Sequence, residues 1–210
     1  ALDAQAAMKI YAAKGRPSDN PLIVHISDIS QLYPLVDGVS EKAEALINAF
    51  WPGPLTLIFK KKDIVPPETS GGLDTVAVRY PENKVAKAFI SASGGPIAAP
   101  SANTSGKPSP TRASHVAYDM DGRIDMIIDG GSCEFGLEST IVDTTCDPPC
   151  LLRPGAVTLG MMKELIGDMT VDKAVVSALK EGEKPKAPGM KYTHYSPKAD
   201  ITIVLSLIHI

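Results

Sequence analysis

The order of hydrophobic and polar residues predicts both helices and strands. From 40 to 50, Ala43, Leu46, Ile47 and Phe50 recur at the i, i+3, i+4, i+7 spacing of one helical face. The runs 22–26, 55–59 and 75–79 are short, apolar and rich in β-branched residues, as buried strands usually are. The pattern therefore predicts one amphipathic helix among several strands.

Further elements follow from turn and cap signals. Residues 3–14 predict a helix with Asp3 as its N-cap and Gly15 as its stop. Other helices are expected at 83–91, 112–120, 159–166 and 171–179, and other strands at 96–99, 124–128, 139–143, 151–153 and 201–205. Several strands are too close in sequence for a helical crossover, so we expect an α/β fold with a mixed parallel and antiparallel sheet.

Composition changes this picture little. The 210 residues contain 44% hydrophobic residues and carry a net charge of -3, which fits a globular domain and argues against a broad nucleic-acid surface. The odd number of cysteines, three, favours a reducing compartment, and neither a signal peptide nor a bilayer-length apolar run is present, so a cytoplasmic protein without membrane contact is expected. We expect a main domain over 1–180, a proline-rich linker over 181–199 and the start of a truncated domain over 200–210.

Polar chemistry concentrates in the segment 94–111, where an apolar run is followed by hydroxyl and amide side chains between prolines and glycines. The prolines exclude a helix, and such a loop suits an anion such as phosphate, although a plain polar turn explains it equally well. Four cations stand at helix or strand ends, where their side chains could hold carboxylates or phosphates. These cations are Lys14, Arg16, Arg79 and Arg153.

Several familiar motifs are excluded by spacing. The segment 105–109 lacks the first glycine of a P-loop, and Pro108 interrupts its Lys-Ser/Thr pair. No G-x-G-x-x-G opens a helix, no His or Cys residues have metal-ligand spacing, and Ser139 does not stand in a G-x-S-x-G elbow. The residues therefore predict neither a dinucleotide fold, a resident metal nor a serine hydrolase.

Taken together in chain order, the motifs resemble the YrdC/Sua5 family of threonylcarbamoyl-AMP synthases. They are Lys14-Gly15-Arg16-Pro17 with Asn20-Pro21-Leu22, WPGPLTL at 51–57, VAVRYP at 76–81, APSANTSGKPSPT at 99–111, GLESTIVD at 136–143 and LLRPGAV at 151–157, with a linker-like tail at 188–197. The resemblance implies a twisted, open mixed sheet with a large concave cavity. It also implies that L-threonine, bicarbonate and ATP condense to threonylcarbamoyl-AMP and pyrophosphate for the modification of adenosine 37 in tRNA.

The resemblance further assigns roles to individual residues. Lys14, Arg16, Ser101 and Asn103 would be catalytic, while His25, Arg79 and Ser139 would hold threonine. ATP would be bound by Lys14, Arg16, Asn20, Thr75, Ser101, Asn103, Ser109 and Arg153, with Tyr192 and Tyr195 closing over the nucleotide. Mg²⁺ would arrive with ATP, and tRNA or a tRNA-modifying complex would act downstream.

Two departures from the family pattern and two alternatives remain at this stage. The chain starts after the family's N-terminal T-x-T-x-Y-G-L strand, and Ala99 stands where some longer members carry a threonine-binding hydroxyl. One alternative is a carbamoyl-adenylate-forming relative, and the other is a non-catalytic module of the same fold that binds double-stranded RNA. Salt-dependent RNA binding without ATP turnover would favour the second.

Overall fold

The structure is a computed structural model that describes residues 1–176. A seven-stranded mixed sheet has the order β4-β1-β3-β2-β5-β6-β7. Its strands are β1 (Ile23–His25), β2 (Leu55–Lys60), β3 (Thr75–Arg79), β4 (Ile97–Ala98), β5 (Thr140–Asp143), β6 (Cys150–Arg153) and β7 (Thr170–Val171). Parallel pairs β1–β3, β2–β5 and β6–β7 alternate with antiparallel pairs, which confirms the predicted mixed α/β sheet.

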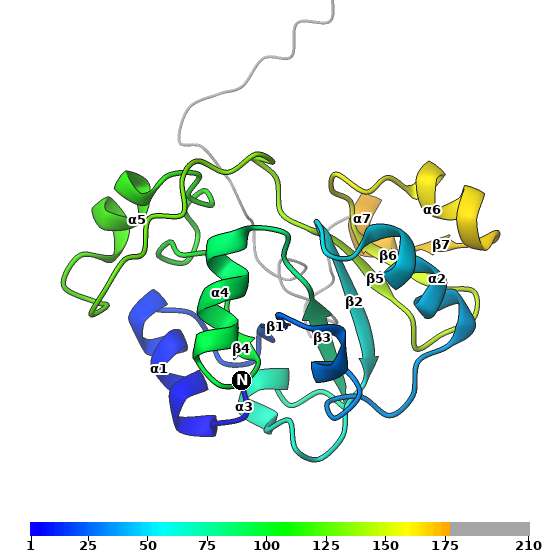
Figure 1. Ribbon diagram of the computed structural model, residues 1–210, viewed down its shortest axis with the longest axis horizontal. Helices are drawn as coiled ribbons and strands as arrows, with labels where there is room; N and C mark the ends of the chain where they lie inside the picture. The colour runs from blue at the N-terminus through cyan, green and yellow to red at the C-terminus, as the bar shows by residue number, and fades with distance from the viewer. Residues whose placement is uncertain (177–210) are drawn as a thin grey trace, which may run out of the picture.

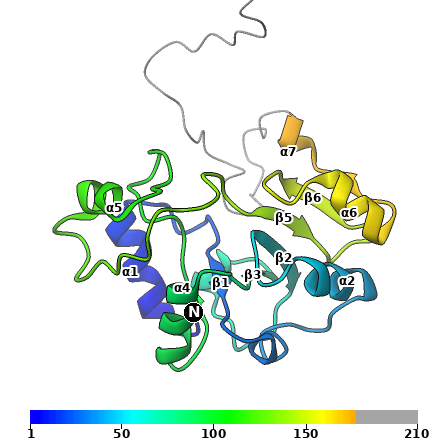
Figure 2. The ribbon, with the colours of Figure 1, turned by 45° about the horizontal axis from the view of Figure 1, so that its top comes forward.

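Helices lie at both ends of this sheet (Figure 1). They are α1 (Ala4–Lys14), α2 (Glu41–Phe50), α3 (Pro67–Ser70), α4 (Lys84–Ala92), α5 (Ala113–Met120), α6 (Leu159–Ile166) and α7 (Lys173–Val176), with a 3-10 turn at Ile29–Gln31. Figure 2 shows α2 and α6 beside the β2, β5 and β6 end, and α1, α4 and α5 at the other end. Within residues 1–176, no helix is long and apolar enough to cross a membrane.

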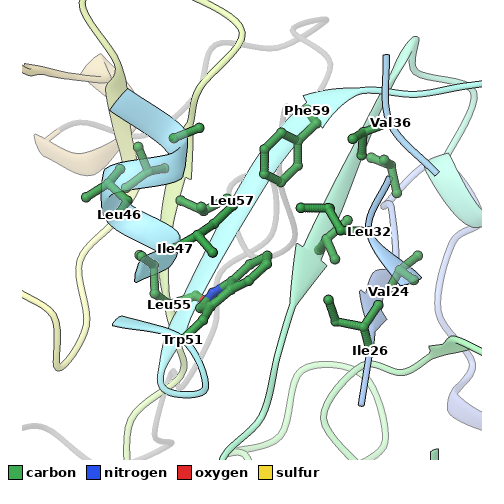
Figure 3. Close-up of a cluster of buried hydrophobic side chains, with 14 of the residues drawn as sticks. Val24, Ile26, Leu32, Val36, Leu46, Ile47, Trp51, Leu55, Leu57 and Phe59 are labelled. Atoms are coloured by element: carbon green, nitrogen blue, oxygen red, sulfur yellow. The ribbon is translucent and has the colours of Figure 1, made fainter. Parts of the chain in front are cut away.

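One face of the sheet, here called the core face, carries the main hydrophobic core. Alternate residues of β2 point to it, namely Leu55, Leu57 and Phe59, and they meet Leu46 and Ile47 of α2 (Figure 3). Helix α2 is amphipathic because its apolar residues recur on one side, and Ser40 caps it by accepting a hydrogen bond from the Ala43 amide.

The opposite face, here called the cavity face, has a much smaller apolar cluster. Ile23, Ile58, Ala77, Ile141 and Leu152 form this cluster. The same strands also carry the polar residues His25, Thr56, Arg79 and Arg153. A register shift between β5 and β6 at Ile141/Val142 leaves Leu152 without a direct register partner there. The cavity face therefore has less apolar burial and more functional side chains.

Two sequence predictions need correction. The apolar run 124–128 is not a strand: it joins no strand of the described sheet, and Ile127 and Ile128 are 38% and 50% exposed. An apolar run becomes a strand only where its backbone amide and carbonyl groups can pair with a neighbouring strand. Val171, predicted to begin a helix, instead pairs with Leu151 in β7. The predicted strand 201–205 and the linker 181–199 lie outside the described residues.

Candidate active site

A cavity of about 310 Å³ opens on the cavity face of the sheet, within the usual size range of ligand sites. Its walls come from the end of α1, from β1, β3 and β6, from the loop 99–111 and from the segment 133–139. The sequence-predicted residues that line it are Lys14, Arg16, Asn20, His25, Arg79, Ser101, Asn103, Ser109, Ser139 and Arg153. The structure thus brings together four cations whose convergence the sequence could only suggest.

Strand register explains how these side chains meet. His25 pairs with Arg79, Arg79 with Thr56, Thr56 with Ile141, and Ile141 with Arg153, so these five residues form one cross-strand row. Directly paired residues of neighbouring strands present their side chains on the same face. The cross-strand row therefore brings an imidazole from β1 and guanidinium groups from β3 and β6 to the floor of one cavity.

Lys14 connects α1 to the loop 99–111. Its ammonium group donates to the backbone oxygens of Ser101 and Asn103, the second at 2.5 Å, and its side chain is only 6% exposed. Burial, followed by repulsion from Arg16, lowers the Lys14 pKa to about 8. The residue thus fixes the loop and remains a cation near neutral pH.

Arg16 and Asn20 belong to the loop that follows α1. The Arg16 guanidinium donates to the backbone oxygens of Asn20 and Pro21, at 3.1 and 2.8 Å, and this holds the loop in shape. Asn20 Oδ1 is buried and has no hydrogen-bond partner among the described residues. Since this oxygen can only accept, it suits an N–H or O–H group of a ligand rather than a phosphate oxygen.

Asn103 organises the loop that the sequence singled out. Its side-chain amide donates to the backbone oxygens of Thr104 and Lys107, both at 2.8 Å, and its Oδ1 faces Lys14 Nζ at 3.5 Å. Gly106 has φ of +88°, a conformation that glycine adopts without strain. Asn103 is therefore occupied with the loop itself, while Ser101 and Ser109 stand on the cavity wall.

Arg79 and Arg153 carry the charge of the cavity floor. Arg79 Nε donates to Gly53 O at 3.1 Å, and Arg153 Nε donates to Ser139 O at 3.0 Å. Burial lowers the pKa of both guanidinium groups, that of Arg153 to about 10, and repulsion from Arg79 and Arg16 contributes to the latter. Both arginines remain charged at neutral pH, and an anion between them would relieve this repulsion.

His25 lies beside Arg79 in the cross-strand row. Burial and repulsion from Arg79 lower its pKa to about 4, so its imidazole is neutral at neutral pH. Its Nδ1 lies 3.1 Å from Ile23 O, an oxygen that can accept a hydrogen bond from the ring. His25 is thus a fixed neutral polar group rather than a further cation.

Glu138 is the carboxylate of the cavity wall, and it accepts a hydrogen bond from Ser109 Oγ at 2.7 Å. Its charge raises the pKa of Arg153 against the effect of burial. Within residues 1–176, no three His, Cys, Asp or Glu side chains gather as metal ligands.

Thr75, which was predicted to bind ATP, does not line the cavity. It begins β3 and pairs with Lys60, whereas Arg79 ends the same strand. The two residues are four steps apart along an extended strand, a distance of roughly 13 Å. The assignment of Thr75 to the ATP site is therefore not supported by its position. Tyr192 and Tyr195 lie outside the described residues.

Four residues of this region received no role from the sequence. Glu138 and Thr56 stood inside quoted motifs, yet no role was given to either. Phe135 was not singled out, although it lines the cavity with 47% of its surface exposed, as does Leu137 with 70%. An exposed phenyl ring beside a charged cavity could have been noticed only once the segment 133–139 was placed in space.

The arrangement can hold a ligand with several negative charges. Lys14, Arg16, Arg79 and Arg153 supply positive charge, and serine hydroxyls supply hydrogen bonds, within one partly enclosed space. Fixed cations and donors stabilise charge that develops on phosphoryl oxygens without needing to reorganise. The apolar wall of Phe135 and Leu137 adds a surface for an uncharged ring.

Known proteins match both ends of the chain. A family model covering Sua5, YciO and YrdC, described as "Telomere recombination", matches residues 1–155. A second, described as "Threonylcarbamoyl-AMP synthase, C-terminal domain", matches residues 157–207. The boundary between the models lies near the end of β6 in Figure 1, and the longer match contains all the cavity residues described above.

Individual relatives of known name point to the same family. Threonylcarbamoyl-AMP synthases of Bacillus subtilis and Pyrococcus abyssi are 54% and 52% identical over 97% of this chain. The chain spans 58% and 59% of their lengths. A crystal structure of P. abyssi Sua5 complexed with L-threonine superimposes with a TM-score of 0.91 at 52% identity, covering 95% of this chain and 58% of that one. These matches confirm the resemblance drawn from the motifs: the chain belongs to the Sua5/YciO/YrdC family.

Proposed function

We propose that this chain acts as an L-threonylcarbamoyladenylate synthase, condensing L-threonine, bicarbonate and ATP to threonylcarbamoyl-AMP and pyrophosphate. The observation that carries the proposal is the convergence of Lys14, Arg16, Arg79 and Arg153 with serine hydroxyls over one cavity. Such a site suits two anionic substrates held side by side, one a triphosphate and the other an amino acid. The names of the relatives at 52–54% identity point to the same reaction.

The chemistry needs positioning more than a strong base. The threonine amine attacks the carbon of bicarbonate and water leaves, which gives a carbamate. A carbamate oxygen then attacks the α-phosphorus of ATP, the bond from that phosphorus to the bridging oxygen breaks, and pyrophosphate leaves with the electron pair. Both reactants are negatively charged, so the protein accelerates the step mainly by aligning them and by stabilising charge.

The phosphate end of the cavity consists of Lys14, Arg16 and the hydroxyls of the loop 99–111. Lys14 and Arg16 would neutralise phosphoryl oxygens, and Ser101 would donate a hydrogen bond to them, while the Ser109 hydroxyl donates to Glu138. Asn103 would act by holding the loop, since its amide hydrogens bond to that loop. Asn20 Oδ1 would accept from an N–H or O–H group of a substrate, for example a ribose hydroxyl.

The amino-acid end lies over the cross-strand row. Arg79 would bind the threonine carboxylate through its planar guanidinium, and Ser139 would donate a hydrogen bond. His25 is neutral because burial lowers its pKa to about 4, so it can contact threonine without repelling its ammonium group. A pocket gains only about 1–3 kcal/mol from one methyl group, so selection against serine is expected to be modest.

Mg²⁺ fits this site as a companion of ATP. The cavity wall offers cations and hydroxyls with the carboxylate of Glu138, which is bonded to Ser109. Magnesium commonly stays with substrate phosphates and water rather than in a protein cage. When bound, it would neutralise part of the phosphate charge, and Lys14 and Arg16 would hold the remainder.

The apolar wall completes the nucleotide site. Phe135 and Leu137 expose large apolar surfaces on the cavity, and the adenine ring would cover them by stacking on Phe135. Closure by Tyr192 and Tyr195 stays a prediction from the sequence.

The product would serve the N6-threonylcarbamoyl modification of tRNA, with tRNA or its modifying complex acting after release. A cytoplasmic location is supported by the free cysteines Cys133, Cys146 and Cys150, because free thiols persist in reducing compartments.

Pyrophosphate release from Mg-ATP tests this function. Threonine and bicarbonate are omitted in turn, serine replaces threonine, and ATP binding is followed separately by calorimetry. We expect release that requires both co-substrates and prefers threonine. Pyrophosphate release that does not depend on threonine would contradict the proposal. So would the absence of release from a folded protein that binds ATP. Salt-dependent binding of double-stranded RNA in that second case would favour the binding module instead.

A further inference from the structure

Thr56 is an exception within β2. The other residues of the strand that are buried are apolar, yet Thr56 carries a hydroxyl and has an exposed fraction of 0%. It lies in the cross-strand row between Arg79 and Ile141, beneath the cavity and outside its lining. A buried hydroxyl costs free energy unless it is hydrogen-bonded, and valine would have the same shape without that cost.

The Thr56 hydroxyl has one described partner. Thr56 Oγ1 lies 2.7 Å from Ser139 Oγ, and the Ser139 side chain lines the cavity although the residue is only 4% exposed. Arg153 Nη2 lies 3.1 Å from the same Ser139 oxygen. Three side chains from β2, β6 and the residue preceding β5 therefore meet at one hydroxyl oxygen.

Counting protons fixes the direction of these bonds. Arg153 can only donate, so Ser139 Oγ accepts from it. If Ser139 also donated to Thr56, the buried Thr56 proton would have no acceptor among residues 1–176. The arrangement that satisfies every group has Thr56 donating to Ser139. Both lone pairs of Ser139 Oγ are then used, and its own O–H group is left to donate into the cavity.

We infer that Thr56 is a positioning residue that fixes Ser139 as a hydrogen-bond donor to the carboxylate of the amino-acid substrate. Arg79, the direct register partner of Thr56, lies on the same face and supplies the matching positive charge. A hydroxyl held in this direction suits an oxygen that only accepts, and it would be wasted on the substrate ammonium group. The inference rests on the proposed synthase function and adds a residue that does not touch the substrate.

Thr56→Val tests this role because it removes the hydroxyl and keeps the branched shape. We expect the KM for threonine to rise roughly fivefold to tenfold, in line with the loss of one oriented hydrogen bond, while the KM for ATP changes less than about twofold. Serine and threonine share the same carboxylate, so the serine-to-threonine ratio of kcat/KM should stay constant. Thr56→Ser, which retains the hydroxyl, should restore the KM for threonine.

Thr144→Val is the matched control. Its hydroxyl also bonds to β2, donating to Ile58 O at 2.6 Å, but Thr144 lies outside the cavity lining. Both valine variants are expected to unfold at lower temperature, and only Thr56→Val should change the KM for threonine. An unchanged KM in Thr56→Val, an equal rise in Thr144→Val, or a rise confined to ATP would overturn the inference. Absence of threonine-dependent pyrophosphate release in the unaltered protein would instead overturn the proposed function, and the inference with it.

Discussion

The two faces of the sheet use the same strands for different purposes. On the core face, Leu55 and Leu57 are fully buried among other apolar side chains. On the cavity face, the next residue along β2 is Thr56, and its register partner is Arg79. The period of two along a strand lets one residue stabilise the fold while its neighbour shapes the site. Substitutions on the core face are therefore expected to lower stability, and substitutions on the cavity face are expected to lower binding.

Leu57→Ala should give the largest effect, and it should fall on stability alone. Leu57 has an exposed fraction of 0% and packs within the core shown in Figure 3. Removing its side chain leaves a cavity, so the free energy of unfolding should fall by about 2–5 kcal/mol. Denaturant titration measures this loss, and kcat/KM of the folded fraction serves as the control. A large loss of kcat/KM at full folding would break the separation between the faces.

Arg79→Ala should show the opposite behaviour. The loss of a charged partner for the threonine carboxylate should lower kcat/KM for threonine roughly 100-fold, with a smaller effect on ATP binding. Steady-state kinetics with each substrate varied provides the measurement, and Arg79→Lys, which keeps the charge but not the planar fork, is the control. Equal losses for threonine and ATP would contradict the role assigned to Arg79.

Gly155→Ala should affect both faces, because Gly155 approaches the chain at the start of β5 very closely. A Cβ atom at this position would lie 2.6 Å from the Thr140 amide nitrogen and 2.7 Å from Glu138 O, so backbone must move. We expect a loss of about 1–3 kcal/mol in unfolding free energy, together with weaker threonine binding as Ser139 shifts. Gly160→Ala is the control, since its nearest neighbour would be the Thr158 hydroxyl at 3.8 Å. Wild-type stability and binding in Gly155→Ala would contradict the close contact.

A change of pH should have the smallest effect, and it should fall on the affinity for ATP. The Lys14 pKa is lowered to about 8 by burial, so its positive charge is lost as pH rises through that value. ATP affinity should therefore fall by up to about tenfold between pH 7 and 9, provided that Lys14 holds phosphate. Lys14→Met should bind ATP more weakly with a flat profile over this range.

The same pKa has a consequence for stability with the opposite sign. The folded-state pKa lies below the usual 10.5, so between pH 8 and 10.5 the unfolded state binds more protons than the folded state. The Lys14 contribution to the free energy of unfolding therefore increases over this window. Denaturant titrations of wild type and Lys14→Met at the two ends of the window would isolate it. A contribution that decreases would contradict the lowered pKa.

Local patterns predicted much of the fold. The short apolar runs that became β2 and β3 and the helical period of α2 are local features, and the structure confirms all three elements. The run 124–128 had the same apolar character but found no partner strand, and β7 has only two residues, Thr170 and Val171. Whether such a segment joins a sheet depends on distant chain, which local sequence does not report.

The site was predicted in its residues more than in its geometry. Helix and strand ends indicated Lys14, Arg16, Arg79 and Arg153, and the resemblance gave them roles. Only the structure shows that they share one cavity. Thr56 could not be recognised, because a threonine inside an apolar strand is common and its role depends on contact with Ser139. Thr75 begins β3, at the opposite end from Arg79 and outside the cavity lining, and its assignment to ATP stays a prediction.

Thermal unfolding of wild type and Arg79→Met, with and without L-threonine, tests the contrast between the faces most directly. Arg79 is half-buried in the cavity, and its positive charge helps to lower the pKa of Arg153. Without ligand, we expect Arg79→Met to unfold at the same temperature as wild type or higher. Threonine should raise the unfolding temperature of wild type but not of the variant. A variant that unfolds several degrees lower without ligand and still gains stability from threonine would contradict the account.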